Sequence, residues 1–370
     1  MKIVFAGGGT AGHINPALAV AGYIKERIPE AEISYIGTER GLESRLVRAE
    51  NYAFYPIDIR GFQRKLTVGN MKENVRNVYR VFKSSADAKK ILRQLNPDVV
   101  VGTGGYVSGP VLRMAVKLGI KTAIHEQNAF PGVTSKMLAG SVDKVMLAMP
   151  EAEAYLKCKQ APVVTGNPVR GSLFRYSKEE AREILGLDHR PMVLSFGGSL
   201  GARPINEAVA GMLKWANHQN KCYFYHATGK AGFAHMQTLL REKEVDLSDD
   251  GIRLSEYIDN MDVLLPAADL VICRAGAITL SEIECCGKAS ILIPSPYVAE
   301  NHQYHNAMTL VNKKAAAILE EKDLNDASLI SKVQTMLEHP QILREMEQNA
   351  RACAIADANK RIADVILSIV

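Results

Sequence analysis

Two glycine-rich segments constrain the fold more than any other feature of this sequence. Residues 7–12 follow the apolar run 3–6, and residues 197–201 follow the apolar run 192–196. After each glycine segment, apolar residues recur with the spacing of an amphipathic helix. A buried strand, a glycine turn and a helix form the repeating unit of a parallel α/β sheet. The chain therefore contains this unit in both halves.

Further short apolar runs extend the same pattern along the chain. We expect additional strands at residues 33–36, 99–101, 122–124, 144–147, 222–226, 270–273 and 290–293. A chain of 370 residues is more than twice as long as a typical domain of ~150 residues. The sequence therefore predicts an α/β protein with two doubly wound parallel-sheet domains, and the pattern restarts near residue 166.

Two helix boundaries follow from local signals. The helix after residues 7–12 is expected to begin at Asn15, which can cap it, with Pro16 in its first turn. The C-terminal stretch 341–370 is helical in pattern and has no strand after it. The sequence leaves open whether this stretch closes the second domain or returns to the first.

Positive charge is concentrated in one segment. Residues 60–93 contain ten Lys or Arg and two Asp or Glu, so this segment carries +8 and the remainder −3 of the net +5. A single basic segment favours a local anionic partner such as a membrane surface over nucleic acid, with a solvated helix face as the alternative. The sequence shows no apolar run of bilayer length and no signal peptide, which predicts a cytosolic protein.

Candidate site residues follow the predicted strands. His13 comes directly after the first glycine segment, where an imidazole is either a general base or a packing residue. Glycines and hydroxyls occupy residues 103–110, and four polar residues occupy 125–128. Both segments stand at the carboxyl ends of strands, where parallel sheets bind ligands.

The second half offers a site for a nucleoside phosphate. Glycines at residues 197–201 would expose backbone amides at a helix N-terminus, which suits a phosphate or pyrophosphate. Thr279 and Glu282 lie on one predicted helical turn, where the carboxylate suits a vicinal diol such as ribose; ordinary first-turn residues are the alternative. The His302 and His305 pair lacks a companion carboxylate cluster, and we expect no metal site. The six cysteines have no C-x-x-C spacing and are expected to be reduced packing residues.

Six segments together resemble the MurG family of bacterial N-acetylglucosaminyltransferases. They are residues 7–13, 104–110, 125–128, 166–170, 197–203 and 274–282. The resemblance implies a GT-B fold, in which two Rossmann-like domains face each other across a cleft. The first domain would comprise residues 1–165, completed by the C-terminal helix 346–370, and the second residues 166–345. Two small departures from the family pattern, Ala11 for glycine and Ala275 for serine, affect only fine contact geometry.

The resemblance also implies the reaction. A member of this family moves N-acetylglucosamine from UDP-N-acetylglucosamine to the 4-hydroxyl of N-acetylmuramic acid in undecaprenyl-pyrophosphoryl-MurNAc-pentapeptide. This converts lipid I to lipid II in peptidoglycan synthesis, with inversion and without a metal or other cofactor. The partners would be the donor, the lipid acceptor and the anionic inner-membrane surface, with no nucleic acid, and the enzyme would bind peripherally at the cytoplasmic face of the membrane.

The resemblance assigns roles to individual residues. His13 is the first candidate for the catalytic base and Glu126 the second. Gly104, Gly105, Tyr106 and Ser108 would lie on the acceptor side. The donor-binding residues would be Thr10, Ala11, Gly12, Asn128, Arg170, Ser199, Ile258, Ala277, Ile278, Thr279, Leu280, Ser281, Glu282 and Gln303.

The basic segment then gains an expected role at the membrane. Val75, Val78, Tyr79, Phe82 and Ala86 have the spacing of one helix face and are flanked by basic residues. The expected membrane-contact residues are Leu66, Val68, Met71, Lys72, Val75, Arg76, Tyr79 and Arg80. Three alternatives remain at this point: a UDP-N-acetylglucosamine 2-epimerase, a hydride-transfer enzyme that uses the G-x-G-x-x-G segment, and a membrane-recruited scaffold without catalysis.

Overall fold

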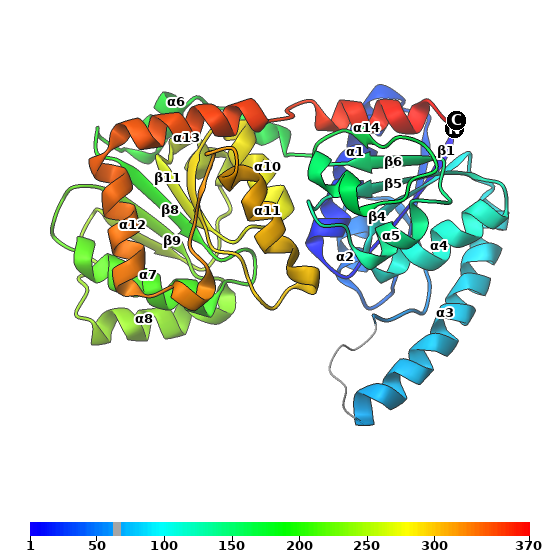
Figure 1. The fold of residues 1–370 in the computed structure, drawn as a ribbon, viewed down its shortest axis with the longest axis horizontal. Coiled ribbons are helices and arrows are strands. Elements are labelled where there is room, and N and C mark those ends of the chain that lie inside the picture. The colour runs from blue at the N-terminus through cyan, green and yellow to red at the C-terminus, as the bar shows by residue number, and fades with distance from the viewer. Residues whose placement is uncertain (62–67) are drawn as a thin grey trace. The chain divides into compact units, whose positions relative to one another are not determined.

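The chain folds into two compact units, Met1–Val169 with Ala356–Val370, and Arg170–Ile355. The computed structural model describes residues 1–61 and 68–370, and for residues 68–79 it describes only the backbone, within helix α3. Each unit is a parallel sheet covered by helices (Figure 1). The predicted α/β class with two parallel-sheet domains is therefore confirmed.

The first unit is built on a seven-stranded parallel sheet within the described residues. Its strand order is β3-β2-β1-β4-β5-β6-β7. The strands are β1 (Lys2–Gly7), β2 (Glu32–Gly37), β3 (Ala53–Pro56), β4 (Val99–Gly104), β5 (Lys121–Glu126), β6 (Lys144–Leu147) and β7 (Val163–Val164). The helices are α1 (Ala11–Arg27), α2 (Leu42–Ala49), α3 (Val68–Leu95), α4 (Gly105–Lys117) and α5 (Val133–Leu138). Buried apolar residues of β1, β4 and β5 fill the core on both faces of this sheet, as expected for a sheet covered on two sides.

Helix α1 corrects one boundary predicted from the sequence. It begins at Ala11, with the extended residue Thr10 as its N-cap, and Pro16 lies inside the helix. The helix accommodates Pro16 because the carbonyl that loses its partner belongs to Gly12, an exposed residue that water can reach. His13 therefore lies in the first turn of α1, rather than before the helix.

The C-terminal helices are divided between the two units. Helix α13 (Pro340–Cys353) packs against α10 and β12 of the second unit. Helix α14 (Ala358–Leu367) packs against α1 of the first unit, with Ile362, Ala363 and Ile366 buried in its core (Figure 1). The chain passes back to the first unit at residue 356, after the position 346 expected from the sequence.

The second unit repeats this architecture with a six-stranded parallel sheet. Its strand order is β10-β9-β8-β11-β12-β13. The strands are β8 (Met192–Phe196), β9 (Tyr223–Ala227), β10 (Ile252–Ser255), β11 (Leu270–Cys273), β12 (Ala289–Leu292) and β13 (Ala317–Ile318). Besides α13, the helices are α6 (Lys178–Leu185), α7 (Arg203–Ala216), α8 (Phe233–Glu242), α9 (Met261–Ala267), α10 (Ala277–Cys286), α11 (His302–Val311) and α12 (Asp326–Glu338).

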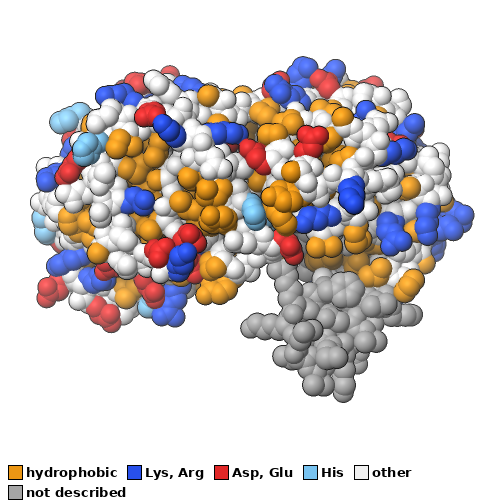
Figure 2. All heavy atoms as spheres, in the orientation of Figure 1, with side chains coloured by type: hydrophobic (Ala, Val, Ile, Leu, Met, Phe, Trp, Pro, Cys, Tyr) orange, Lys and Arg blue, Asp and Glu red, His pale blue; other side chains and the backbone are white. Residues whose placement is uncertain are grey.

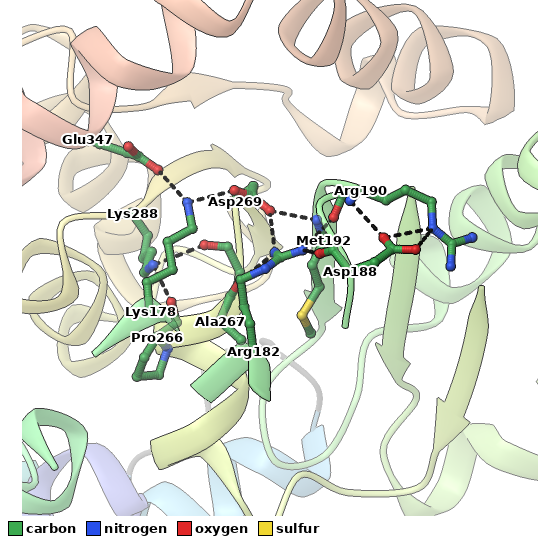
Figure 3. A network of polar contacts seen from close by, with 11 residues as sticks. Lys178, Arg182, Asp188, Arg190, Met192, Pro266, Ala267, Asp269, Lys288 and Glu347 are labelled. Atoms are coloured by element: carbon green, nitrogen blue, oxygen red, sulfur yellow. Dashed lines mark hydrogen bonds and ion pairs between the residues drawn. The ribbon is translucent and has the colours of Figure 1, made fainter. Parts of the chain in front are cut away.

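A polar network ties the helices of the second unit to its sheet (Figure 3). The Asp269 carboxylate accepts hydrogen bonds from the Arg182 guanidinium at 3.0 Å and from the backbone N–H of Met192 at 2.7 Å. It also pairs with Lys178 at 2.6 Å. The buried Lys288 ammonium donates to the carbonyls of Pro266 at 2.5 Å and Ala268 at 3.0 Å. These carbonyls belong to the C-terminal end of α9, where a cation is favourable, so the network fixes α6 and α9 against β8 and β11.

A second polar cluster lies inside the unit at the end of β9. The Nε2 atom of His226 lies 3.1 Å from Asn206 Oδ1, and its Nδ1 lies 2.8 Å from the hydroxyl of Ser195. Asn206 donates its side-chain amide to the carbonyl of Thr228 at 3.0 Å, so its oxygen accepts from His226. Burial lowers the pKa of His226 to about 4. The imidazole is therefore neutral in the folded protein at neutral pH.

This buried histidine predicts acid-sensitive stability. Unfolded His226 takes up a proton near pH 6.5, whereas the folded residue does so near pH 4. Its contribution to stability is complete above pH 6.5 and is lost as the pH falls from about 6.5 to 4, by up to roughly 3 kcal/mol. Chemical unfolding of the wild type and of His226→Gln across this range measures the contribution, and His189→Gln at an exposed position is the control. If wild type and His226→Gln show the same pH slope, the assignment is wrong.

Candidate active site

Each sheet reverses its strand order at one point, and several predicted site residues follow the strands that flank it. The reversal lies between β1 and β4 in the first unit and between β8 and β11 in the second. In open parallel sheets, ligands bind outside the carboxyl ends of the strands at such a point. The first glycine segment follows β1 and the second follows β8, so each unit carries a glycine loop at its binding position.

Glycines let two loops of the first unit approach closely. Gly105 has a φ of +75°, and a Cβ atom there would overlap the carbonyl oxygen of Gly8. Gly104 has a φ of +107°, and a Cβ atom there would lie 2.6 Å from Nδ1 of His13. Left-handed backbone and close packing both require glycine at these positions. The predicted acceptor-side glycines therefore shape the space that the His13 ring occupies.

His13 is held on two sides. Its backbone carbonyl accepts a hydrogen bond from the Thr103 hydroxyl at 2.7 Å, and its Nδ1 atom lies 3.1 Å from Oε1 of Gln127. The ring itself is partly exposed. Gln127 is only 2% exposed and was not among the residues predicted for the site. The one available signal was its place among the four polar residues 125–128, which did not separate it from its neighbours.

Glu126 has a different environment from His13. It is the last residue of β5, not part of a loop after the strand, and it is 3% exposed. Its Oε1 atom accepts from the backbone N–H of Asn128 at 3.0 Å and from the Asn128 side-chain amide at 3.1 Å. Its Oε2 atom accepts from the N–H of Gly132 at 3.0 Å. Glu126 therefore anchors the loop 128–132, and this arrangement favours His13 as the base.

Another buried carboxylate supports the first glycine loop. Glu43, in the first turn of α2, is fully buried. It accepts hydrogen bonds from the Thr38 hydroxyl at 2.6 Å and from the Thr38 N–H at 3.0 Å. A longer contact of 3.4 Å joins it to the N–H of Gly9. Glu43 therefore links the end of β2 to the glycine loop, a role that the sequence did not indicate.

Ser108 is buried inside the first unit, whereas Tyr106 lines a pocket on its surface. Ser108 is buried, and its hydroxyl lies 2.7 Å from the carbonyl oxygen of Ala6 and 2.8 Å from that of Gly104. This hydroxyl therefore joins β1 to the start of α4 inside the unit and does not face a ligand. Tyr106 lines a pocket of about 710 Å³ at the carboxyl edge of the sheet. The other lining residues are Thr38, Glu39, Arg40, Gly41, Pro56, Ile57, Asp58, Ile59, Arg60, Arg80 and Asp87.

In the second unit, the structure brings Arg170 and Glu282 together. The Arg170 Nε and Nη2 atoms donate to Oε1 of Glu282 at 3.0 and 2.9 Å. The Glu282 side chain is 8% exposed, whereas that of Arg170 is 56% exposed. Burial raises the pKa of Glu282, and the adjacent guanidinium opposes this shift. The cation is thus available at the surface, while the carboxylate beneath it holds it in place.

The remaining donor-site candidates of this unit lie along the same edge. Ala277 to Ser281 form the start of α10, directly after the turn that follows β11, and no acidic residue lies in this first turn. Ser199 is exposed in the loop after β8, whereas Ile258 is buried after β10. Gln303, in the first turn of α11, accepts a hydrogen bond from the N–H of Ser295 at 2.8 Å. All follow carboxyl ends of strands, where backbone amides of a helix N-terminus suit an anion.

The candidates Thr10, Ala11, Gly12 and Asn128 belong to the first unit. Thr10 to Gly12 form the start of α1, and Asn128 begins the loop anchored by Glu126. In the part of the chain that the structure describes, no three His, Cys, Asp or Glu side chains are close enough to hold a metal ion. Like the second unit, the first unit thus has a helix N-terminus and a glycine loop at the carboxyl edge of its sheet.

Comparisons with known proteins agree with this geometry. Residues 3–147 match the glycosyltransferase family 28 N-terminal domain, and residues 192–362 match the corresponding C-terminal domain. A protein of Acetivibrio thermocellus is 45% identical over 100% of this chain and 98% of its own length. A protein of Bacillus cytotoxicus is 43% identical over 99% of this chain and 98% of its own. Both are named UDP-N-acetylglucosamine–N-acetylmuramyl-(pentapeptide) pyrophosphoryl-undecaprenol N-acetylglucosamine transferase.

A solved structure extends the similarity to the fold. The crystal structure of MurG from Acinetobacter baumannii superposes with a TM-score of 0.79 at 31% identity and covers 99% of each chain. The match runs through both units and includes the segments that carry His13, Arg170 and Glu282. The two-domain GT-B fold expected from the sequence is therefore confirmed. On these grounds the chain belongs to glycosyltransferase family 28 and, within it, to the MurG family of N-acetylglucosaminyltransferases.

Proposed function

We propose that this chain transfers N-acetylglucosamine from UDP-N-acetylglucosamine to undecaprenyl-pyrophosphoryl-MurNAc-pentapeptide, in peptidoglycan synthesis. The observation that carries the proposal is the full-length similarity to enzymes with this name, together with a partly exposed histidine at the switch point of the first sheet. The new bond joins the 4-hydroxyl of N-acetylmuramic acid to the anomeric carbon of the donor sugar. A single displacement inverts that carbon.

His13 is the proposed base of this reaction. As the acceptor oxygen attacks, the 4-hydroxyl proton passes to the imidazole, and the electron pair of the breaking bond leaves with the β-phosphate of UDP. His13 lies in the first turn of α1 beside Gly104 and Gly105. The pocket that Tyr106 lines, at the carboxyl edge of the same sheet, is the proposed place for the acceptor. The pocket lining contains three arginines, Arg40, Arg60 and Arg80, beside three carboxylates, those of Glu39, Asp58 and Asp87. The arginines would contact the anionic groups of the acceptor.

The donor is proposed to bind the carboxyl edge of the second sheet. Glu282 would accept hydrogen bonds from the ribose hydroxyls, and Arg170 and Ser199 would contact the pyrophosphate. The first turn of α10, from Ala277 to Ser281, would add backbone amides. Fixed cationic and amide groups stabilise the charge that develops on the departing UDP, and no metal is needed for that role. Ile258 and Gln303 would contact the uracil and the sugar, and Thr10, Ala11, Gly12 and Asn128 would complete the donor site.

The proposed base predicts a specific loss of turnover. His13→Ala should lower kcat by about 10²- to 10⁴-fold, the range that general base catalysis contributes. The measurement is transfer of labelled sugar from UDP-N-acetylglucosamine to the lipid-linked acceptor in detergent. His189→Ala, at an exposed position of the second unit, is the matched control and should keep wild-type turnover. Full turnover of His13→Ala would rule out this base, and an inactive wild type would rule out the proposed reaction.

The donor site predicts a different kinetic signature. Glu282→Gln keeps the size of the side chain but removes the charge that pairs with Arg170. Hydrogen bonds to charged groups are worth about 1.5–3 kcal/mol, so KM for UDP-N-acetylglucosamine should rise roughly 10- to 100-fold. KM for the acceptor should remain unchanged. An unchanged donor KM would show that the carboxylate does not hold the ribose.

We also propose that the first unit binds an anionic membrane surface through α3. In residues 80–95 of this helix, whose side chains are described, Ala88 and Leu92 are buried in the core, whereas Phe82 is 72% exposed. Ala86 is exposed as well, and Lys83, Lys89, Lys90 and Arg93 are exposed around them. Hydrophobic and basic side chains lie side by side on this part of the first unit in Figure 2.

This surface has the composition of an interfacial helix, with an apolar anchor among cations. Membrane binding by this surface would bring the enzyme to its lipid-linked acceptor, because such a substrate cannot leave the membrane. Arg80 lies among the described side chains, whereas the membrane-contact candidates Leu66, Val68, Met71, Lys72, Val75, Arg76 and Tyr79 lie outside them. Among the residues that the structure describes, no helix is both long and apolar enough to cross a bilayer. The basic, partly apolar surface of α3 and the lipid-linked acceptor support a proposed peripheral location at the cytoplasmic face of the cell membrane.

Vesicle binding tests this surface. The combined variant Phe82→Ser, Lys89→Glu, Lys90→Glu should bind vesicles containing anionic lipid at least tenfold more weakly, since each basic residue near the surface is worth about 1 kcal/mol. UDP binding should be unaffected because none of these three residues is among the proposed donor contacts. Phe174→Ser, at an exposed position of the second unit, is the control. Equal vesicle binding by the combined variant and the wild type would show that this half of α3 is an ordinary solvated face.

A further inference from the structure

The orientation of the Gln127 side-chain amide is determined by its surroundings. Its Nε2 atom lies 3.0 Å from the carbonyl oxygen of Thr103 and 2.9 Å from that of His125. Carbonyl oxygens only accept hydrogen bonds, so the amide nitrogen must occupy this position. The Oε1 atom then faces Nδ1 of His13 at 3.1 Å. Reversing the amide would place the carbonyl oxygens of Thr103 and His125 against the amide oxygen, and these buried carbonyls would lose their donor.

The neighbouring histidine is consistent with this orientation. Nε2 of His125 lies 2.9 Å from the carbonyl oxygen of Gly166, so Nε2 carries the hydrogen. His125 is buried, and burial lowers its pKa, which keeps the ring neutral. Its Nδ1 atom is therefore an acceptor, and it lies 3.1 Å from Nε2 of Gln127. Gln127 thus donates to Nδ1 of His125, and Nε2 of His125 donates to the carbonyl of Gly166.

We propose that Gln127 is a positioning residue that holds His13 in the tautomer with its hydrogen on Nδ1. An amide oxygen can only accept, so the Nδ1 atom of His13 must donate to Oε1. The other ring nitrogen, Nε2, then carries the lone pair. This inference rests on the proposed transferase function, in which Nε2 of His13 takes the proton of the acceptor hydroxyl. One hydrogen bond thus decides which nitrogen acts as the base.

The use of an amide instead of a carboxylate follows from burial. Gln127 is 2% exposed and is surrounded by the carbonyl oxygens of Thr103 and His125. An ionised carboxylate there would lose its hydration and place its second oxygen against these two carbonyl oxygens, which is strongly unfavourable. The neutral amide satisfies both carbonyls and still presents an acceptor to His13. It orients the imidazole without adding a negative charge that would bind the transferred proton tightly.

The tautomer of His13 can be measured directly. The full-length protein is labelled with ¹⁵N-histidine, and long-range ¹H–¹⁵N correlation spectra are recorded at alkaline pH, where imidazoles are neutral. His13→Ala identifies the His13 signals by their loss. We expect a protonated Nδ1 and an unprotonated Nε2. A protonated Nε2 in the wild type overturns the proposal, whether or not the transfer reaction is observed.

Two substitutions at Gln127 separate positioning from folding. Gln127→Met has a similar size but offers no acceptor, whereas Gln127→Glu retains an oxygen opposite Nδ1 and, when protonated, can donate to the Thr103 carbonyl. Gln127→Met should lower kcat at least tenfold, part of the 10²- to 10⁴-fold that base catalysis contributes. KM for UDP-N-acetylglucosamine should stay unchanged. Gln127→Glu should have a higher kcat than Gln127→Met, and the His13 signals of Gln127→Met should shift toward a mixture of tautomers.

The outcomes distinguish the possible failures. Unchanged kcat in Gln127→Met, or turnover of Gln127→Glu no higher than that of Gln127→Met, overturns the positioning role. A variant that fails to fold would lose UDP binding as well, and the wild-type spectrum then decides the question alone. Absence of transfer by the wild type would instead contradict the proposed function, while the spectrum still reports the tautomer.

Discussion

The close approach of two backbone loops at the carboxyl edge of each sheet is the constraint on which both units depend. In the first unit, a Cβ atom at Gly105 would overlap the carbonyl of Gly8, and in the second, one at Gly201 would overlap the carbonyl of Thr228. Both glycines have positive φ, so neither position accepts another residue without strain. The loops can therefore meet only where glycine removes the side chain, and in the first unit the neighbouring Gly104 also leaves room for the His13 ring.

Both units place a neutral buried imidazole beneath these loops and fix it with an amide. In the first unit His125 contacts Gln127, and in the second His226 contacts Asn206. Burial lowers the pKa of both histidines. These two histidine–amide contacts therefore form without charge, which avoids the cost of burying an ion. The buried carboxylates act elsewhere: Glu43 and Glu126 accept hydrogen bonds from loop backbone of the first unit, and Glu282 holds Arg170.

The sequence predicted the central strands well because each is a short, continuously apolar run that becomes buried on both faces. It missed β3, β7, β10 and β13, which lie at or next to the sheet edges, where mixed composition weakens the signal. The start of α1 was misplaced because the local preference of Asn15 and Pro16 for a helix start gave way to the turn at Thr10. Local signals thus located the elements better than their ends.

The sequence correctly located candidate residues at the carboxyl ends of strands where a distinctive residue stands in a motif, as for His13 and Glu282. A residue could not be predicted where its role depends on long-range contact. Gln127 acts through a residue 114 positions away in the chain, and Glu43 acts through the backbone of a loop 34 positions away. Ser108 presents the converse case, because a hydroxyl in a glycine-rich motif suggests a ligand contact while the fold uses it internally.

The pair formed by Arg170 and Glu282 shows how the second unit can prepare a site before its ligand arrives. A largely buried carboxylate alone would be costly, and its raised pKa reflects that cost. The guanidinium offsets part of it, and in return both of its donating nitrogens are fixed on a single oxygen, Oε1. In the proposed complex, the ribose and pyrophosphate of UDP would meet these two groups already oriented. Their rotational freedom is lost on folding and not on binding, which is the advantage of preorganisation.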